Sequence, residues 1–441
     1  MNFNPMHHLE FFICCLTALL VLSLAGCNTP ESTKVMPIAP GWAATRVNVS
    51  IYRHHSIFTH DNRQFVSFYD PDGYAVMAYR DLPSEDWTIN RMDWKGNVRD
   101  AHNMISMAAS TDGILHVTYD HHTSTLRYRR SDKPLDPTTF GPIIPMTGQR
   151  EKQVTYPQFV NLSDGTLLFI YRDGVSGNGD VCINRYDVRK KKWQVLQHPL
   201  IAGKGKCNAY ICRPATGTDG SIHLAWCWRR SGNAETNSKI CYARSLDGGR
   251  TWTDSSGKLY ELPITQQTAE VIDPVGENNT LSNQDTSELD SKNRMHIVYR
   301  KVDTSKVPQY YHMWWDGDKW RRTQITRYKG SFTVKGPGTK AIPMSRPNIL
   351  FDTDDRICML YRDVRLGSKP MMAIADAPDY DKWSNVTLAD VDLMLWEPNY
   401  DLGRWRKERV LDLLLQPTNQ GDHEGVTETG PQMVNVLEYR P

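Results

Sequence analysis

The chain has 441 residues and a formal net charge of only +2 at pH 7, so no overall electrostatic field marks it as a binder of nucleic acid or of a membrane surface. A chain of this length forms two or three ordinary domains or one large repetitive domain, and it can bury a substantial core without disulfides or metal ions. Its 29 glycines, 25 prolines, 13 tryptophans and 20 tyrosines, without long helical periodicity, favour an all-β fold of many short strands.

The N-terminus has the pattern of a bacterial export signal. Residues 11–26 form an apolar run that ends in Leu24-Ala-Gly-Cys27, which resembles a lipobox whose cysteine is lipidated after cleavage in front of it. The run is short for a membrane span, so an uncleaved anchor is the weaker alternative. One feature counts against the lipobox interpretation, because the first ten residues contain no Lys or Arg. We predict a signal peptide over 1–26, lipidation at Cys27 and a tether over 28–40. The mature protein is then an exported outer-membrane lipoprotein, at the cell surface or in the periplasm, that contacts the membrane only through its lipid.

The body of the chain repeats one unit, in which a polar turn with Asp-Gly or an Asp-rich equivalent precedes an apolar strand that ends in an aromatic residue and often an arginine. The instances lie at 72–80, 112–119, 164–172, 219–229, 293–300 and 355–362. Strands repeating at this period are typical of a β-propeller, in which each unit is a four-stranded blade. The segment Ser245–Trp252 also matches the Asp-box of sialidase-like repeats, S-x-D-x-G-x-T-W, a structural hairpin turn. We predict one propeller over 41–441 with six clear blades and a seventh shared between the chain ends.

Two histidines flank one predicted hairpin. His102 precedes the apolar run 104–109, the turn follows at 110–113, and His122 comes after the strand 114–119. Both side chains are therefore expected at the same edge of the sheet, at the mouth of the propeller channel. Two imidazoles with pKa values near neutrality can remove one proton and deliver another. We predict an acid/base pair of His102 and His122, although any single histidine among 14 is more often a surface or packing residue.

Strand alternation points the adjacent His121 to the other side of the sheet. His116 lies inside the strand and is expected to be structural.

The next unit contributes a glycine-rich loop at the predicted pocket rim. It runs from Tyr171 through Asn178 to Gly179 and leads to Arg185. No helix and no Lys-Ser/Thr element follow, so a phosphate-binding loop is excluded. Tyr171 offers a phenol and Arg185 a planar guanidinium suited to a carboxylate or sulfate. The alternative is that Tyr171 only ends a repeat strand and that Arg185 lies on a solvated face.

Further aromatic and basic residues are candidates for binding a sugar chain. Trp228, with its neighbour Trp226, can offer a stacking surface, and Arg172 and Arg229 can supply positive charge. Packing between blades is a strong competing role for the two tryptophans. We predict substrate binding by Arg172, Asn178, Trp228 and Arg229.

Six cysteines remain after the predicted signal peptide and Cys27 are removed, and most lie in apolar, strand-like runs where small buried side chains are the default. They are Cys182, Cys207, Cys212, Cys227, Cys241 and Cys358. Cys207 and Cys212 share a loop and could pair in an oxidising compartment. A sharper alternative is a structural zinc ion held by His198, Cys207, Cys212 and Cys227, although this spacing matches no standard zinc finger.

Several segments together resemble a known family, the bacterial ulvan lyases with a seven-bladed propeller fold, among the BNR-type repeat proteins. The resemblance covers nearly the whole mature chain. It rests on Asp100-Ala-His-Asn103, the segment 115–128, Val154-Thr-Tyr-Pro-Gln-Phe159, the loop 171–179, Asn283-Gln-Asp-Thr-Ser287 and Trp396-Glu-Pro-Asn-Tyr-Asp401.

The resemblance implies cleavage of a sulfated, uronic-acid-containing algal polysaccharide by β-elimination, which leaves a 4,5-unsaturated uronate. His102 and His122 would then be the acid/base pair, with Tyr171 and Arg185 at the scissile sugar, and Arg185 would neutralise the uronate carboxylate. Which histidine is the base stays open at this point. The chemistry requires no cofactor, although family members can carry a structural zinc. The expected partner is an anionic polysaccharide and not a nucleic acid.

Two other functions fit a propeller. A sialidase-like glycoside hydrolase needs a pair of catalytic carboxylates or an arginine cluster with a Tyr/Glu nucleophile pair. Asp70, Asp120, Asp173 and Glu288 are available for that, but no spacing singles them out. A non-catalytic glycan-binding propeller would account equally well for the Asp-box and the repeats.

Overall fold

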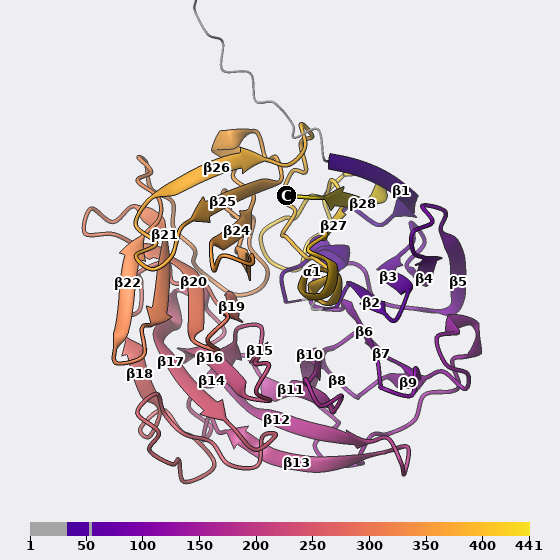
Figure 1. The fold of residues 1–441 in the computed structure, drawn as a ribbon, viewed down its shortest axis with the longest axis horizontal. Helices are drawn as coiled ribbons and strands as arrows, with labels where there is room; N and C mark the ends of the chain where they lie inside the picture. Colours follow the sequence, from indigo (N-terminus) through magenta and orange to yellow (C-terminus); the bar gives the residue numbers. More distant parts are fainter. Residues whose placement is uncertain (1–32, 53–54) are drawn as a thin grey trace, which may run out of the picture.

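The computed structural model describes residues 33–52 and 55–441, which form seven antiparallel β-sheets arranged as a ring (Figure 1). The predicted signal peptide and Cys27 lie outside the described residues. Seven sheets around one axis are a seven-bladed β-propeller, so the predicted fold class is confirmed. We number the blades in chain order, and blade 7 contains both ends of the described chain.

The strands of the first four blades run outward from the channel in sequence order, with small departures in blades 3 and 4. Blade 1 contains β2 (Ile57–His60), β3 (Arg63–Tyr69), β4 (Tyr74–Asp81) and β5 (Thr88–Lys95). Blade 2 contains β6 (Ile105–Ala109), β7 (Leu115–Tyr119) and β9 (Tyr128–Arg130). Blade 3 contains β10 (Val154–Asn161), β11 (Leu167–Val175), β12 (Asn178–Asp187) and β13 (Lys192–Ile201), and β8 (His122–Ser124) adds to β10. Blade 4 contains β14 (Asn208–Ile211), β15 (Ala215–Thr216), β16 (Ile222–Arg229), β17 (Asn237–Ser245) and β18 (Glu270–Asp273).

The remaining blades complete the ring. Blade 5 contains β19 (Thr286–Leu289), β20 (Met295–Val302), β21 (Pro308–Trp315) and β22 (Trp320–Gln324). Blade 6 contains β23 (Asn348–Phe351), β24 (Ile357–Tyr361), β25 (Met371–Ala375) and β26 (Trp383–Thr387). Blade 7 contains β27 (Leu411–Leu415), β28 (Gln432–Tyr439) and β1 (Thr33–Gly41). The helical segments are α1 (Leu402–Glu408) and the short 3₁₀ turns η1 (Arg46–Asn48), η2 (Pro137–Thr139), η3 (Ala234–Thr236) and η4 (Val364–Leu366).

The two ends of the described chain close the ring in blade 7. Strand β1 pairs antiparallel with β28, from Thr33 opposite Tyr439 to Gly41 opposite Gln432. The predicted seventh blade shared between the chain ends is therefore confirmed. The predicted tether is wrong from residue 33 onward, because those residues form β1. Pro37 and Pro40 hide the strand pattern in the sequence, and they are tolerated because β1 lies at the edge of its sheet.

Apolar clusters between neighbouring blades hold the ring together. The Asp-box shows how the repeat turn contributes to one of them. Asp247 Oδ1 accepts hydrogen bonds from the backbone N–H groups of Arg250 and Thr251, both at 2.9 Å. The turn buries Trp252 completely against side chains of β16 and β17, and its indole Nε1 donates to Gly249 O at 3.0 Å. The structural role predicted for the Asp-box is confirmed.

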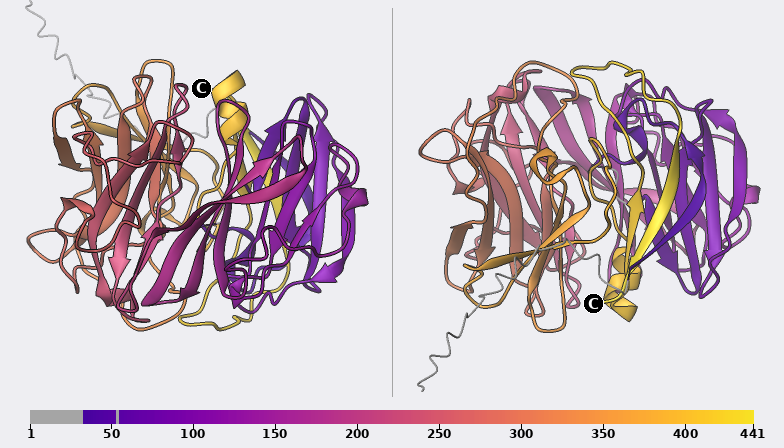
Figure 2. Two further views of the ribbon diagram at one scale, coloured as in Figure 1. Left: turned by 90° about the horizontal axis from the view of Figure 1, so that it is seen from below. Right: turned by 90° about the horizontal axis from the view of Figure 1, so that it is seen from above.

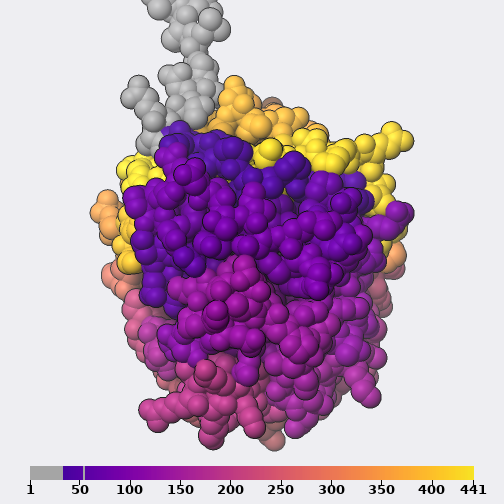
Figure 3. Space-filling view, turned by 90° about the vertical axis from the view of Figure 1, so that its right-hand side faces the viewer, coloured from indigo at the N-terminus to yellow at the C-terminus, as the bar shows by residue number. Residues whose placement is uncertain are grey.

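The ring has two distinct ends (Figure 2), with α1 at one of them and C-terminal loops at the other. Figure 3 looks at the outer edge, where colours running from indigo to magenta show consecutive blades side by side. First strands of neighbouring blades, such as β6 and β10 or β19 and β23, lie beside each other around the axis. No helix among residues 33–52 and 55–441 is long and apolar enough to cross a membrane.

Candidate active site

The predicted histidine pair lies at one end of the β6–β7 hairpin. Ile105 pairs with Tyr119, so His102 just before β6 and His122 just after β7 emerge at the same end. His122 also pairs with Thr155 of β10, which places it at the seam between blades 2 and 3. The two imidazole rings stack with centroids 3.9 Å apart and planes 16° from parallel. The juxtaposition predicted from the hairpin is present.

One carboxylate holds both rings. Asp100 Oδ1 lies 2.6 Å from His102 Nδ1, and Asp100 Oδ2 lies 2.6 Å from His122 Nδ1. Burial alone would raise the pKa of Asp100, but its hydrogen bonds to the two imidazoles hold that pKa well below its usual range. An ionised carboxylate only accepts hydrogen bonds, so both Nδ1 atoms carry protons. A neutral ring in this pair therefore has its lone pair on Nε2, and a charged ring carries a proton there.

The surroundings of the two rings favour protonation of one over the other. Burial lowers the pKa of His102, but Tyr156, Tyr52, Asp100 and Glu424 outweigh it and raise that pKa well above the ordinary value. Burial and the neighbouring His102 lower the pKa of His122. Two stacked imidazoles this close do not both accept a charge readily. The resting pair therefore carries one charge, on His102, and leaves His122 neutral.

Two tyrosines complete the wall around His102. Tyr52 stacks on it with centroids 5.6 Å apart, and the ring of Tyr156 lies at 5.5 Å. Tyr156 has a backbone φ of +55°, a left-handed conformation that is strained for a bulky residue. Strain of this kind clusters at functional sites, where the surrounding structure enforces it. Tyr52, His102 and Tyr156 line one pocket together with Arg229 and Arg346.

Behind Tyr156, two arginines converge on a third tyrosine. Arg229 Nη1 donates to Tyr210 Oη at 2.9 Å and Arg172 Nη1 at 3.4 Å, while Ser176 Oγ lies 2.8 Å away. The Arg172 guanidinium also lies 5.0 Å from the centroid of the Tyr156 ring. Burial would raise the pKa of Tyr210, but Arg229, Arg172 and the hydrogen bonds lower it to about 7. Arg172 and Arg229 carry two positive charges, and Tyr210 carries at most one negative charge. These three side chains together therefore keep at least one net positive charge, whether Tyr210 is a phenol or a phenolate.

We expect one tyrosine of the protein to ionise near pH 7. Tyrosinate absorbance should rise through that pH in the native protein, and Tyr210→Phe should remove this step. Arg229→Met takes away a positive charge and should move the step to higher pH, because the phenolate loses its nearest stabilising cation. A spectrophotometric titration that shows no tyrosinate below pH 9 would contradict the assignment.

Two of the predicted site residues lie away from the histidine pair. Tyr171 is buried in the core of blades 2 and 3, where its ring contacts Phe169 and His198. Arg185 lies on β12, where its Nη2 donates to Thr166 Oγ1 at 3.3 Å. Neither lines the pocket that contains His102. The tyrosines and arginines that line that pocket are instead Tyr52 and Tyr156, with Arg46, Arg229, Arg300 and Arg346.

The predicted binding residues divide in the same way. Arg172 and Arg229 lie in the site as described. Trp228 is completely buried between blades 3 and 4, where it packs edge-on against Trp226, so its predicted stacking on sugar is wrong and the packing alternative holds. Asn178 is exposed at the β11–β12 turn opposite Val175 and borders a separate surface pocket.

Sequence reasoning missed Asp100 and Tyr156 as functional residues. Both lie within segments that carry the family resemblance, so that signal was available. What the sequence could not show is that one carboxylate reaches both rings, or that the residue after Thr155 turns its ring toward His102.

The four residues predicted to hold zinc are not brought together. His198 Nε2 lies 2.8 Å from Asn184 Oδ1, and Cys207 packs in a different apolar cluster from Cys212 and Cys227. All six described cysteines are buried free thiols, so the alternative Cys207–Cys212 disulfide is absent as well. Within the described part of the chain, one group of three or more metal-ligating residues has its ligand atoms within 4.8 Å of one another, and its members are Asp100, His102, His122 and Glu424. Both Nδ1 atoms there donate to Asp100, so the two rings have only their Nε2 atoms left for a proton or a metal ion.

The carboxylates considered for a hydrolase are engaged elsewhere. Asp70 pairs with Arg91, Asp120 with Arg127, Asp173 with Arg150, and Glu288 with both Arg213 and Arg406. Each of these four carboxylates is therefore paired with an arginine, and no two of them share the same one.

The other two histidines of the hairpin are structural, as expected for His116. His116 is fully buried between Tyr128 Oη at 2.7 Å and Ser110 Oγ at 3.1 Å. His121 is also buried, and its Nε2 accepts a hydrogen bond from the backbone N–H of Arg127 at 3.2 Å. Burial lowers the pKa of each to about 3, so both are neutral.

A family model described as "BNR repeat-containing family member" matches residues 63–328, which is more than half of the chain. The chain belongs to this BNR repeat-containing family. Among curated proteins, an ulvan lyase of Alteromonas sp. (strain LOR) is 20% identical over 315 residues, covering 62% of this chain and 64% of that protein. The long isoform of an ulvan lyase from Alteromonas sp. is 30% identical over 122 residues, covering 25% of this chain and 12% of that protein. The chain thus spans less than two thirds of either relative.

Solved structures show a likeness in fold over most of the chain. The polysaccharide lyase Uly1 matches with a TM-score of 0.67 at 15% identity, covering 88% of this chain and 90% of that one. A PL25 ulvan lyase matches with a TM-score of 0.64 at 12% identity, covering 89% and 93%. At these identities the match shows the fold. The resemblance to propeller-type ulvan lyases is confirmed.

Proposed function

We propose that this protein is a polysaccharide lyase that cleaves a sulfated, uronic-acid-containing polysaccharide of the ulvan type by β-elimination. The observation that carries the proposal is the stacked His102–His122 pair on Asp100, with one ring charged and one neutral, beside arginines in a pocket. The names of the relatives agree with it. Among the solved structures is a PL25 ulvan lyase bound to -[GlcA(1-4)Rha3S]-, a polymer of this class.

The first requirement of elimination is to acidify the C5 proton of the uronate. That proton leaves only when the charge of the adjacent carboxylate is neutralised, because the intermediate is an enolate. Arg229 lines the pocket with His102, and Arg172 lies behind Tyr156, so these two replace Arg185 in the predicted role. Burial raises the pKa of Tyr156, which keeps its phenol protonated and able to donate a hydrogen bond to the carboxylate.

The second requirement is a base and an acid. Neutral His122 takes the C5 proton on Nε2, and the C5 electron pair forms the C4–C5 double bond as the C4–O4 bond breaks. Charged His102 delivers its Nε2 proton to the departing O4, so the pair ends with its charge exchanged and no net proton is consumed. Asp100 keeps both Nδ1 atoms protonated throughout. The scheme uses no metal ion.

Ultraviolet absorbance during incubation with ulvan tests the proposal. Elimination creates a conjugated 4,5-unsaturated uronate and should raise the absorbance in step with chain cleavage. New reducing ends without that rise would instead support a glycoside hydrolase. Retention on immobilised ulvan with neither signal would support a glycan-binding propeller. Either of these results, obtained with several uronate-containing polysaccharides, contradicts the lyase proposal.

A further inference from the structure

A second cavity lies at the end of the channel opposite the histidine pair. Strand β6 starts just after His102 and ends at Ala109, which lines this cavity of about 250 Å³. Helix α1, which lies over the middle of the ring (Figure 1), adds Leu402, Gly403 and Arg406 to the wall, and we call it the α1 cavity. None of the described residues that line the α1 cavity also lines the pocket of His102. The two ends of the channel (Figure 2) therefore hold two separate cavities.

Three side chains in the wall of the α1 cavity carry buried polar atoms that have no hydrogen-bond partner. Gln158 on β10 is completely buried, and neither Nε2 nor Oε1 of its amide has a partner within the described part of the chain. Arg213 Nε and His55 Nδ1 are buried and unpartnered in the same way. An unpaired buried polar group is costly, and three of them around one cavity point to a polar ligand.

The charges around the α1 cavity favour an anion. Glu288 accepts Arg213 Nη2 at 2.6 Å and Arg406 Nη2 at 2.8 Å, so these three side chains together keep one net positive charge. Arg213 Nη2 also donates to Tyr400 Oη at 2.8 Å, while Nε is left for a further acceptor. Burial and the neighbouring Arg213 lower the pKa of His55 to about 4, so the imidazole is neutral at pH 7.

The remaining features of the α1 cavity suit a single sugar ring. Phe58 and Phe159 contribute apolar surface for the C–H groups of a ring. The Gln158 amide can donate to one hydroxyl and accept from another, and a neutral imidazole offers one donor and one acceptor. The volume lies below the roughly 300–1,000 Å³ of most ligand pockets, so the cavity takes one ring rather than a chain. Asn161 and Gly403 are exposed at its rim, which opens it to solvent.

We propose that the α1 cavity binds one uronic-acid residue, with its carboxylate on Arg213 and Arg406 and its hydroxyls on Gln158 and His55. The choice of a sugar acid among small hydroxylated carboxylates rests on the proposed lyase function, whose substrate and products contain uronates. The ligand is a free uronic acid or the uronate at one end of a cleaved oligosaccharide. The site holds its ligand without reaction, because the acid/base pair lies at the other end of the channel.

Calorimetric titration of the full chain tests the site, with glucuronate, glucose and acetate as probes at matched ionic strength. We expect saturable binding of glucuronate and at least about 10-fold weaker binding of the other two, since glucose lacks the carboxylate and acetate lacks the hydroxyls. Gln158→Leu should weaken glucuronate binding about 10- to 100-fold. Its Tm should stay the same or rise, because no hydrogen bond of the amide within the described structure is lost. If Gln158 serves only in packing, the affinity for glucuronate will not change, and the proposal is overturned.

Charge variants locate the bound glucuronate. Arg406→Met should weaken binding about 10-fold, because Glu288 keeps Arg213 and the net positive charge is lost. Arg91→Met, at an exposed site on β5, is the matched control and should bind as wild type does. Arg229→Met changes the pocket of His102 and should also leave the affinity unchanged. Loss of binding in Arg229→Met together with full binding in Gln158→Leu would place glucuronate in the other pocket and overturn the proposal.

The α1 site and the proposed lyase function can fail separately. Binding of glucuronate that depends on Gln158, without any elimination of ulvan, would overturn the lyase function and leave the α1 site standing. Elimination without such binding, or with equal binding of glucose or acetate, would overturn the α1 site alone. Unsaturated oligosaccharides from the digest distinguish the two sources of ligand. Their displacement of glucuronate supports binding of a chain end, and binding of glucuronate that they do not displace supports a free uronic acid.

Discussion

Replacing His102 or His122 by alanine is expected to lower kcat for uronate elimination by about 10²- to 10⁴-fold, the range typical of a lost general acid or base. Asp100 fixes both rings through Nδ1, and the positive charge sits on His102. The His102 variant therefore loses the general acid, and the His122 variant loses the general base. His60→Ala is the matched control, because His60 ends β2 and lines a different pocket. Circular dichroism should show that all three variants fold.

The pH profile separates the two roles. The pKa of His122 is lowered, so the base is active above that pKa and rate is lost as pH falls through it. The pKa of His102 is raised, so the acid is active below that pKa and rate is lost as pH rises through it. Residual activity of His122→Ala should therefore lack the acidic limb, and that of His102→Ala the alkaline limb. The opposite pattern would exchange the two roles, and a near-wild-type rate in either variant would refute the pair.

Replacing Glu397 by alanine is expected to destabilise the fold by about 3–5 kcal/mol, because it strands two buried guanidiniums. Glu397 is fully buried, and its partners Arg46 and Arg346 come from η1 and from the segment before β23, so this one carboxylate joins distant parts of the ring. Urea unfolding measures the loss. Glu85→Ala removes an exposed pair with Lys34 and should cost no more than about 1 kcal/mol.

Acid should reduce the difference in free energy of unfolding between wild type and Glu397→Ala. The arginines lower the pKa of Glu397 to about 2 from the ordinary value of 4.5, against the effect of burial. A group with a lowered pKa contributes its stabilisation above the unfolded value and loses it as pH falls toward the folded value. The gap between the two proteins should therefore hold above pH 4.5 and narrow toward pH 2. A destabilisation below about 1 kcal/mol at pH 7 would show that the ion pairs of Glu397 with Arg46 and Arg346 do not hold the ring together as proposed.

The propeller and the histidine pair could be predicted because both depend on local patterns. Repeated turn-strand units fix the blades, and a tight hairpin brings His102 and His122 together whatever the rest of the chain does. The position of Tyr171 could not be predicted, because the aromatic residue at the end of a repeat strand can face either the core or the mouth of the channel. No local signal in the sequence distinguishes these two orientations. Tyr156 lies beside His102 with its backbone in an unusual left-handed conformation, and the sequence does not reveal that conformation.

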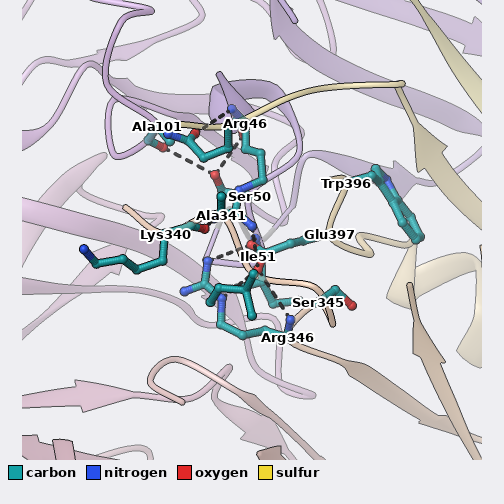
Figure 4. A network of polar contacts seen from close by, with 12 residues as sticks. Arg46, Ser50, Ile51, Ala101, Lys340, Ala341, Ser345, Arg346, Trp396 and Glu397 are labelled. Carbon is teal, nitrogen blue, oxygen red and sulfur yellow. Dashed lines mark hydrogen bonds and ion pairs between the residues drawn. The ribbon is translucent and has the colours of Figure 1, made fainter. Parts of the chain in front are cut away.

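The buried ion pairs of Glu397 could not be predicted from the sequence. Arg46, Arg346 and Glu397 lie in three separate segments of the chain, and nothing in those segments singles them out. Only the closed ring brings both arginines within reach of Glu397 (Figure 4). The four residues predicted to hold zinc are kept apart for the converse reason. Cys207 and Cys212 are near in sequence but pack into different blade interfaces.

The pairing of β1 with β28 has a consequence for biosynthesis. Strand β1 is synthesised before the other described strands, yet its hydrogen-bonding partner β28 lies at 432–439. Until β28 has been synthesised, β1 lacks this partner and the ring cannot close. Contacts of such sequence separation form slowly, and open strand edges invite pairing with other chains. The pairing of β28 with β1 and β27 thus decides whether the other six blades become part of a closed ring or of an open, aggregation-prone arc.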